Sequence, residues 1–195
     1  MSTLNVNNIN EVGGVDAVIT AGVLDKGSLP AGSIVDVQSV LKTDTFSASV
    51  AAGANVAVTD LSITHTLKNA SNKLLIMAYF GAATSSSVSS VASLAIADDG
   101  TLIGVGDAAS SRTRTSAGGV TGGDTTDNLL GRRVGMPSVI FVYEPGDTVS
   151  HTYTVRAINT ETSTLTLYVN RSRDDGDAAY SPRSSSGFVI QEVAG

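Results

Sequence analysis

Apolar and polar residues alternate along several segments of the chain. In residues 61–67, every second position holds Leu, Ile or His, and the positions between them hold Ser or Thr. Residues 149–157 and 164–170 follow the same period of two. Because successive side chains of an extended chain point to opposite faces, this pattern predicts half-buried β-strands.

Other segments predict strands by their composition or by the turns beside them. Residues 73–80 (KLLIMAYF) form a short continuous apolar run, which is typical of a buried strand. The turn signal Asp98-Asp99-Gly100 lies between two apolar segments and therefore predicts a hairpin. The further predicted strands are residues 34–42, 91–97, 101–105, 134–143 and 187–193.

This pattern defines the expected fold class. Between residues 34 and 193 it predicts about eight to ten strands and no convincing helix. Strands of this length and spacing favour an all-β fold, an antiparallel β-sandwich that is jelly-roll-like and carries an extended N-terminal segment. Aromatic residues make up only 5% of the chain and Trp is absent, so the core must consist mainly of Val, Ile, Leu and Ala.

Residues 1–33 differ from the rest of the chain. They are rich in Asn, Gly, Val and Ala, and their apolar pieces at 15–18 and 23–24 are too short to build a core. Such a segment is either a flexible tail or an anchor that becomes ordered against a partner or a sister chain. We therefore divide the chain into an attachment and oligomerisation segment, residues 1–33, and a β-sandwich domain, residues 34–195.

Charge and composition exclude several classes of protein. The chain carries 12 basic and 18 acidic residues, a net charge of -6, and no basic patch, so nucleic acid is not an expected partner. Cysteine is absent, which excludes disulfides and thiolate catalysis. No apolar stretch approaches the roughly 18 residues of a membrane span, so membrane insertion is not expected. The N-terminus also lacks the basic and apolar regions of a signal peptide, which predicts synthesis in the cytoplasm.

Catalytic and metal-binding motifs are not recognisable in the sequence. His65 and His151 form no H-x-H or H-x-x-x-H pair, and we expect both to be packed, hydrogen-bonded residues. The sequence does not exclude a Ser-His-Asp catalytic triad, because the members of a triad need not be adjacent in sequence. The residues 174–177 (DDGD) lack the spacing of an EF-hand and favour a solvated turn over a calcium site. We therefore expect no enzyme activity, no catalytic residue, no metal and no cofactor.

Two long polar loops, residues 106–131 and 171–186, are the predicted binding surfaces. Arginine can bind carboxylates or phosphates through two hydrogen bonds, and tyrosine can stack on a sugar ring. The alternative is that the loops are only solvated, or that they pack against a neighbouring subunit. The candidate receptor-contact residues are Arg112, Arg114, Arg171, Arg173, Asp175, Asp177 and Tyr180.

Three segments resemble the tail-fibre and virion-appendage proteins of marine, cyanophage-like bacteriophages. They are residues 1–40 (MSTLNVNNINEVGGVDAVITAGVLDKGSLPAGSIVDVQSV), 71–80 (SNKLLIMAYF) and 106–119 (GDAASSRTRTSAGG). The resemblance implies a homotrimer located in the virion. It further implies that residues 1–33 bind other virion proteins and that the β domain contacts a glycan or protein on the host cell surface. It brings no catalytic residue with it.

Two other functions remain open at this point. The same fold suits a capsid decoration or cement protein, or a head fibre, which would stabilise a shell instead of binding a receptor. A small carbohydrate-active enzyme is the third possibility. Its carboxylates would have to face each other across a cleft, which a sequence cannot show.

Deletion of the N-terminal segment should leave the β-sandwich folded. The strong strand signals lie in residues 34–193, so a chain that begins at Ser33 should stay soluble. Circular dichroism of this shortened chain should give a β-type spectrum. Aggregation or loss of that spectrum would mean that the N-terminal segment belongs to the core.

Overall fold

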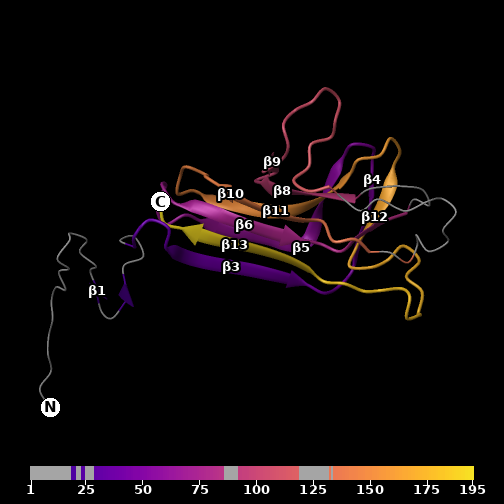
Figure 1. Cartoon of the computed structure of the whole chain (residues 1–195), viewed down its shortest axis with the longest axis horizontal. Helices are drawn as coiled ribbons and strands as arrows, with labels where there is room; N and C mark the ends of the chain where they lie inside the picture. Colours follow the sequence, from indigo (N-terminus) through magenta and orange to yellow (C-terminus); the bar gives the residue numbers. More distant parts are fainter. Residues whose placement is uncertain (1–18, 21–22, 25–28, 86–91, 119–131, 133) are drawn as a thin grey trace, which may run out of the picture.

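Antiparallel strands make up the structure, a computed structural model (Figure 1). The described residues are 19–20, 23–24, 29–85, 92–118, 132 and 134–195. They contain no α-helix, and none of them forms a helix that could span a membrane. Most of the N-terminal segment, residues 1–18, lies outside the described residues.

The strands form three main antiparallel sheets. The first sheet has the order β10 (Ser138–Tyr143), β6 (Lys73–Tyr79), β13 (Ser186–Val193), β3 (Ile34–Lys42). The second sheet has the order β5 (Asn55–Thr66), β11 (Ser150–Asn159), β8 (Ala92–Asp98), β9 (Thr101–Ile103). The third sheet has the order β4 (Phe46–Val50), β12 (Leu165–Val169), β7 (Ala82–Thr84). A separate pair is formed by β1 (Ile19–Thr20) and β2 (Val23–Leu24).

This architecture confirms the predicted all-β antiparallel sandwich. The jelly-roll topology within it stays a prediction. The described residues between 34 and 193 form eleven strands, more than the pattern predicted. The additional strands include β4 and β7, which span five and three residues and are too short to show a clear period of two.

The core lies between the first two sheets and is aliphatic, as the composition required. Alternate residues of each strand point into it, among them Ile76 of β6, Leu94 of β8, Val155 of β11 and Phe188 of β13, all fully buried. Complete burial of one such side chain stabilises the fold by about 1.5–3 kcal/mol.

Two buried asparagines attach the third sheet to the others. The Asn170 side chain donates hydrogen bonds to the carbonyl oxygens of Lys42 and Asp44, at 3.0 and 2.9 Å, and accepts one from Ser186. Its φ of 62° is left-handed, a conformation that Asn tolerates better than most residues. At the other end of β12, Asn159 donates to the carbonyl oxygens of Val50 and Ser163.

Glu192 forms the most deeply buried charged contact of the described residues. Its carboxylate is fully buried and accepts hydrogen bonds from the backbone of Lys68 and the side chain of Asn72, both at 2.7 Å. Its other oxygen lies 3.0 Å from His65 Nε2, while Gln38 Nε2 lies 3.0 Å from His65 Nδ1. Since the Gln38 amide donates to Nδ1, the His65 proton is on Nε2 and is donated to Glu192. His65 is therefore packed and hydrogen-bonded, as predicted.

The two ends of the described domain are paired with each other. Gly32 donates a backbone hydrogen bond to Ala194, and Ala194 donates one to Ser33, each at 2.8 Å. Strand pairing therefore extends to residue 32, just inside the segment 1–33 defined from the sequence. The C-terminus consequently lies beside the start of β3 (Figure 1).

Replacement of Glu192 should test how far this contact stabilises the fold. Glu192→Ala leaves the donors on Lys68, Asn72 and His65 without an acceptor, and should lower the free energy of unfolding by about 3–5 kcal/mol. Glu144→Ala is the matched control, because its ion pair with Lys73 is exposed and should contribute no more than about 1 kcal/mol. Chemical denaturation measures both, and equal losses would contradict this role of Glu192.

Candidate functional site

The outer face of the first sheet is the most distinctive surface of the described residues. Leu74, Ile76 and Ala78 of β6 are buried in the core, so the residues between them point away from it. The same alternation holds along β13, β10 and most of β3. We call this surface the apolar sheet face, defined by Val37, Ser39, Leu41, Leu75, Met77, Tyr79, Ser138, Ile140, Val142, Gly187, Val189 and Gln191.

The strand register arranges these residues in three rows across the four strands. Reading from β10 to β3, the rows are Ser138–Tyr79–Gly187–Leu41, Ile140–Met77–Val189–Ser39 and Val142–Leu75–Gln191–Val37. None of the twelve residues carries a charge. Ile140 and Leu41, at the two edges of the sheet, are 66% and 65% exposed. The face is therefore both apolar and open to solvent.

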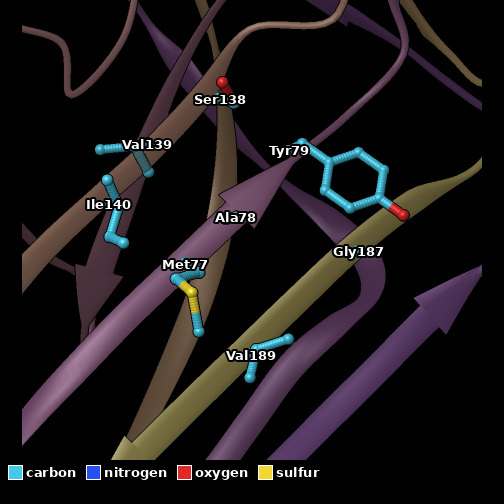
Figure 2. A pocket seen from close by; sticks show the side chains of 8 residues that line it. All are labelled: Met77, Ala78, Tyr79, Ser138, Val139, Ile140, Gly187 and Val189. Atoms are coloured by element: carbon cyan, nitrogen blue, oxygen red, sulfur yellow. The ribbon is translucent and has the colours of Figure 1, made fainter.

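A close approach of Tyr79 to β13 shapes the middle of the face. A Cβ atom at Gly187 would lie 2.6 Å from the Tyr79 ring, so only glycine leaves room for the ring in this position. Figure 2 shows the ring turned toward the strand that carries Gly187. Beside it is a shallow depression of about 410 Å³, lined by Met77, Tyr79, Ile140 and Val189 among others.

The outer face of the second sheet has the opposite character. Thr64 of β5 and Thr152 of β11 point outward there, and their hydroxyl oxygens lie 3.0 Å apart. Arg156 donates a hydrogen bond to Asn55 across the same two strands at 2.8 Å. A sandwich exposed to water on both sides is expected to be polar on both outer faces. In the second sheet, β5 and β11 meet that expectation, whereas Ala95 and Ala97 of β8 are fully buried.

Three of the seven predicted contact residues are held by ion pairs within their own loop. The Arg171 guanidinium lies 3.2 Å from Asp175, which also pairs with Arg183 at 2.7 Å. Arg173 pairs with Asp174 at 3.0 Å. Arg171 also donates hydrogen bonds to the carbonyl oxygens of Ser172 and Arg173. Arg171, Arg173 and Asp175 therefore organise the loop 171–186.

The other four predicted contact residues are exposed. Arg112 and Arg114 lie in the loop after β9, where Arg114 also donates to the Gly106 carbonyl oxygen at 2.6 Å. Asp177 and Tyr180 lie in the loop after β12, and Tyr180 is 54% exposed. Figure 1 shows the two loops projecting from different sides of the sandwich, so the structure does not gather the seven residues into one site. Residues 119–131 of the first loop lie outside the described residues.

One contact does connect the ends of the two loops. The Arg132 guanidinium carbon lies 3.8 Å from the centre of the Tyr180 ring, a cation–π contact. Arg132 is one of the arginines that the sequence places in or beside the predicted binding loop 106–131, although it is not among the seven candidate contact residues.

A second polar cluster, also missed by the sequence analysis, surrounds His151. The imidazole Nδ1 lies 2.8 Å from Asp98 and 3.4 Å from Asp99, and Nε2 lies 3.1 Å from Asp147. The hydrogen bond to Asp147 raises the pKa of His151, and the Asp98 carboxylate adds to this effect. Burial, together with a hydrogen bond to Asp98, raises the pKa of Tyr143 to about 12.

Nucleophilic catalysis finds no support in the described residues. His65 and His151 have Gln, Asp and Glu side chains as their hydrogen-bond partners there, and no serine. The Ser-His-Asp arrangement that the sequence left open is therefore not formed by any described serine.

Comparison with models of known protein families gives no match, and no curated protein matches the chain.

Removal of Arg171 should loosen the loop 171–186. Arg171→Ala removes the ion pair to Asp175 and two backbone hydrogen bonds, so the free energy of unfolding should fall by about 1–3 kcal/mol. Arg112→Ala, in an exposed loop position, should change it by no more than about 0.5 kcal/mol. Thermal unfolding and limited proteolysis of both variants check this, and equal sensitivity would contradict the bracing role of Arg171.

Proposed function

We propose that this protein is a structural virion protein, a homotrimeric bacteriophage fibre whose subunits meet through the apolar sheet face. Residues 1–33 attach it to other virion proteins, and the β domain contacts a glycan or protein on the host surface. The observation that carries the proposal is the contrast between the two outer faces of the sandwich. One is polar along β5 and β11, and the other is uncharged and mostly apolar over three complete rows of side chains.

Charge favours a second copy of this chain as the occupant of that face. Each chain carries a net charge of -6, so two copies repel each other over most of their surface. The apolar sheet face has no charged residue in its three rows, so three copies that turn this face toward a common threefold axis meet there without repulsion. The Lys73–Glu144 ion pair lies beside its last row, at 2.6 Å, and suits the polar rim of an interface.

The sequence of β6 supports the same occupant. Its continuous apolar run predicts a buried strand, yet in the single chain Leu75, Met77 and Tyr79 remain partly exposed. Contact with another subunit would cover these residues and bury both faces of β6. Burial of both faces would explain why the apolar run of β6 is continuous, which the structure of the single chain does not explain.

The size of the face indicates that other residues also contribute to the interface. Four strands spaced about 4.8 Å apart and three rows of side chains give an area of about 400 Å². A stable interface usually buries about 800 Å² on each partner. Residues 1–33, with their short apolar pieces, are the segment that we propose to supply the remainder. This explains why one segment would serve both attachment and oligomerisation.

The strand order supports a jelly-roll topology, which is common in viral coat proteins. The first sheet places β3, the first strand of the sandwich, beside β13, its last strand. The larger strands β3, β5, β6 and β8 alternate between the first and second sheets. A fold is not a function, so this is support by analogy only.

Host contact is assigned to the exposed loop residues. Arg112, Arg114, Asp177 and Tyr180 have side chains available to a glycan or an envelope protein, whereas Arg171, Arg173 and Asp175 position the loop that carries two of them. A capsid decoration protein or head fibre would use the same sandwich at a different position on the virus particle. Imaging of particles labelled with an antibody to this chain distinguishes a position on the tail from one on the head.

Val142→Lys should dissociate the proposed trimer. It places a charge in the apolar sheet face at a position that is 59% exposed in the single chain, so folding should be unaffected. The unaltered protein should have the mass of three chains in light scattering, and the variant the mass of one. Val149→Lys is the matched control, because Val149 is 64% exposed and lies outside the four strands.

Two results would overturn this assignment. A single-chain mass for the unaltered protein at micromolar concentration would exclude self-association. A folded Val142→Lys variant that remains trimeric would place the subunit contact elsewhere.

A further inference from the structure

The cluster around His151 has donor atoms that converge on one point. Asp98 Oδ1 and Asp99 Oδ2 lie 2.8 and 3.4 Å from the same imidazole nitrogen, Nδ1. The three atoms, one from each residue, all lie within 4.8 Å of one another. A nitrogen carries at most one proton, so hydrogen bonding to Nδ1 can satisfy only one of the two carboxylate oxygens well.

Each converging group is fixed in position by a contact to its other polar atom. The second oxygen of Asp98 accepts a hydrogen bond from the Tyr143 hydroxyl at 2.8 Å. The second oxygen of Asp99 accepts one from the Thr152 backbone at 3.0 Å. On the far side of the imidazole, Nε2 lies 3.1 Å from Asp147. The carboxylates and the ring are therefore oriented before any ligand arrives.

The cluster also has an excess of negative charge. Asp98, Asp99 and Asp147 surround a single histidine, and among the described residues no Lys or Arg pairs with any of them. Asp98 is almost completely buried, whereas the Asp99 side chain is 57% exposed. The cluster thus has a closed inner side and an opening to solvent.

We propose that Asp98, Asp99 and His151 form a binding site for a divalent transition-metal ion, and that the preferred ion is Zn²⁺. Imidazole nitrogen and carboxylate oxygen are both common zinc ligands, with bonds of about 2.0–2.2 Å. In a tetrahedral site, such bonds place neighbouring donor atoms about 3.3 Å apart. The two nitrogen–oxygen separations, 2.8 and 3.4 Å, lie near that value, and all three donor atoms lie within 4.8 Å of one another.

The surrounding contacts match those of known zinc sites. A histidine that binds a metal usually donates its other ring N–H to a carboxylate or a carbonyl oxygen, and here Asp147 takes that place. Tyr143 holds the metal-binding carboxylate of Asp98 in the same way. Water would complete the coordination on the open side at Asp99.

The other histidine cluster lacks this arrangement. Asp36, His65 and Glu192 also lie close together, but the Glu192 oxygens already accept hydrogen bonds from Lys68, Asn72 and His65. His65 Nδ1 has the Gln38 amide as its partner at 3.0 Å and lies 3.9 Å from Asp36, whereas both carboxylates lie closer to His151 Nδ1. Glu192 is fully buried, with no opening to solvent. This second cluster serves as the internal control.

Calorimetric titration of the metal-free full-length chain with zinc sulfate tests the proposal. One Zn²⁺ should bind per chain, and Asp99→Asn should weaken binding at least about tenfold. Asp99 is largely exposed, so its replacement should not disturb folding. Asp36→Asn is the matched control and should leave the affinity within about twofold. X-ray absorption at the zinc edge should show one imidazole nitrogen with oxygen ligands.

Three results would overturn the site. They are the absence of one-to-one zinc binding, an affinity that Asp99→Asn does not change, or an affinity that Asp36→Asn reduces instead. Calcium provides a further check on the chemistry, because it prefers oxygen ligands only. A hundredfold excess of calcium should not displace the zinc, and displacement would contradict a histidine ligand. Oligomeric state is not part of this test, so the result is independent of the trimer proposal.

Discussion

The position of β13 between β3 and β6 is the constraint on which the rest of the domain depends. Among the described strands, β3 pairs with β13 alone, so the first strand of the sandwich is joined to its sheet through the last. Glu192 strengthens this junction by accepting hydrogen bonds from His65 of β5 and from Lys68 and Asn72 of the following turn. A buried carboxylate is stable only with such a set of donors. The strand β13 therefore connects the first sheet to the second and the start of the domain to its end.

The two outer faces of the sandwich differ in the kinds of side chain that they carry. Hydroxyl and charged side chains cover the outside of β5 and β11 in the second sheet, where water is the expected neighbour. The first sheet presents uncharged, mostly apolar rows, and Gly187 allows the Tyr79 ring to lie across them. Loops at other places carry the exposed Arg and Tyr side chains. The proposed subunit contact and the proposed host contact therefore involve different parts of one domain.

The sequence predicted the strands well where alternation was regular and long. The segments 61–67 and 149–157 overlap β5 and β11, respectively, in all but one residue each, because one side of each strand is buried and the other is solvated. Short strands such as β7 gave too few positions to show a period. Which face of β3 or β10 turns to the core could not be predicted, because apolar residues occur on both faces.

The two candidate sites depend on contacts between distant parts of the chain. The apolar sheet face combines β3, β6, β10 and β13, and no local segment contains its rows. Asp98 and His151 are 53 positions apart and become neighbours through the pairing of β8 with β11. The sequence analysis interpreted Asp98-Asp99-Gly100 as a turn only. That interpretation was correct but incomplete, because a single sequence does not reveal which distant side chain a turn approaches.

The central place of β13 has a consequence for biosynthesis. β13 follows every other described strand of the sandwich along the chain, so it is translated after them, and its residues Gly187, Val189 and Gln191 form a whole column of the apolar sheet face. A chain that stops before residue 186 lacks this column and leaves β3 without the strand partner that it has among the described residues. The complete face therefore exists only once β13 has been made.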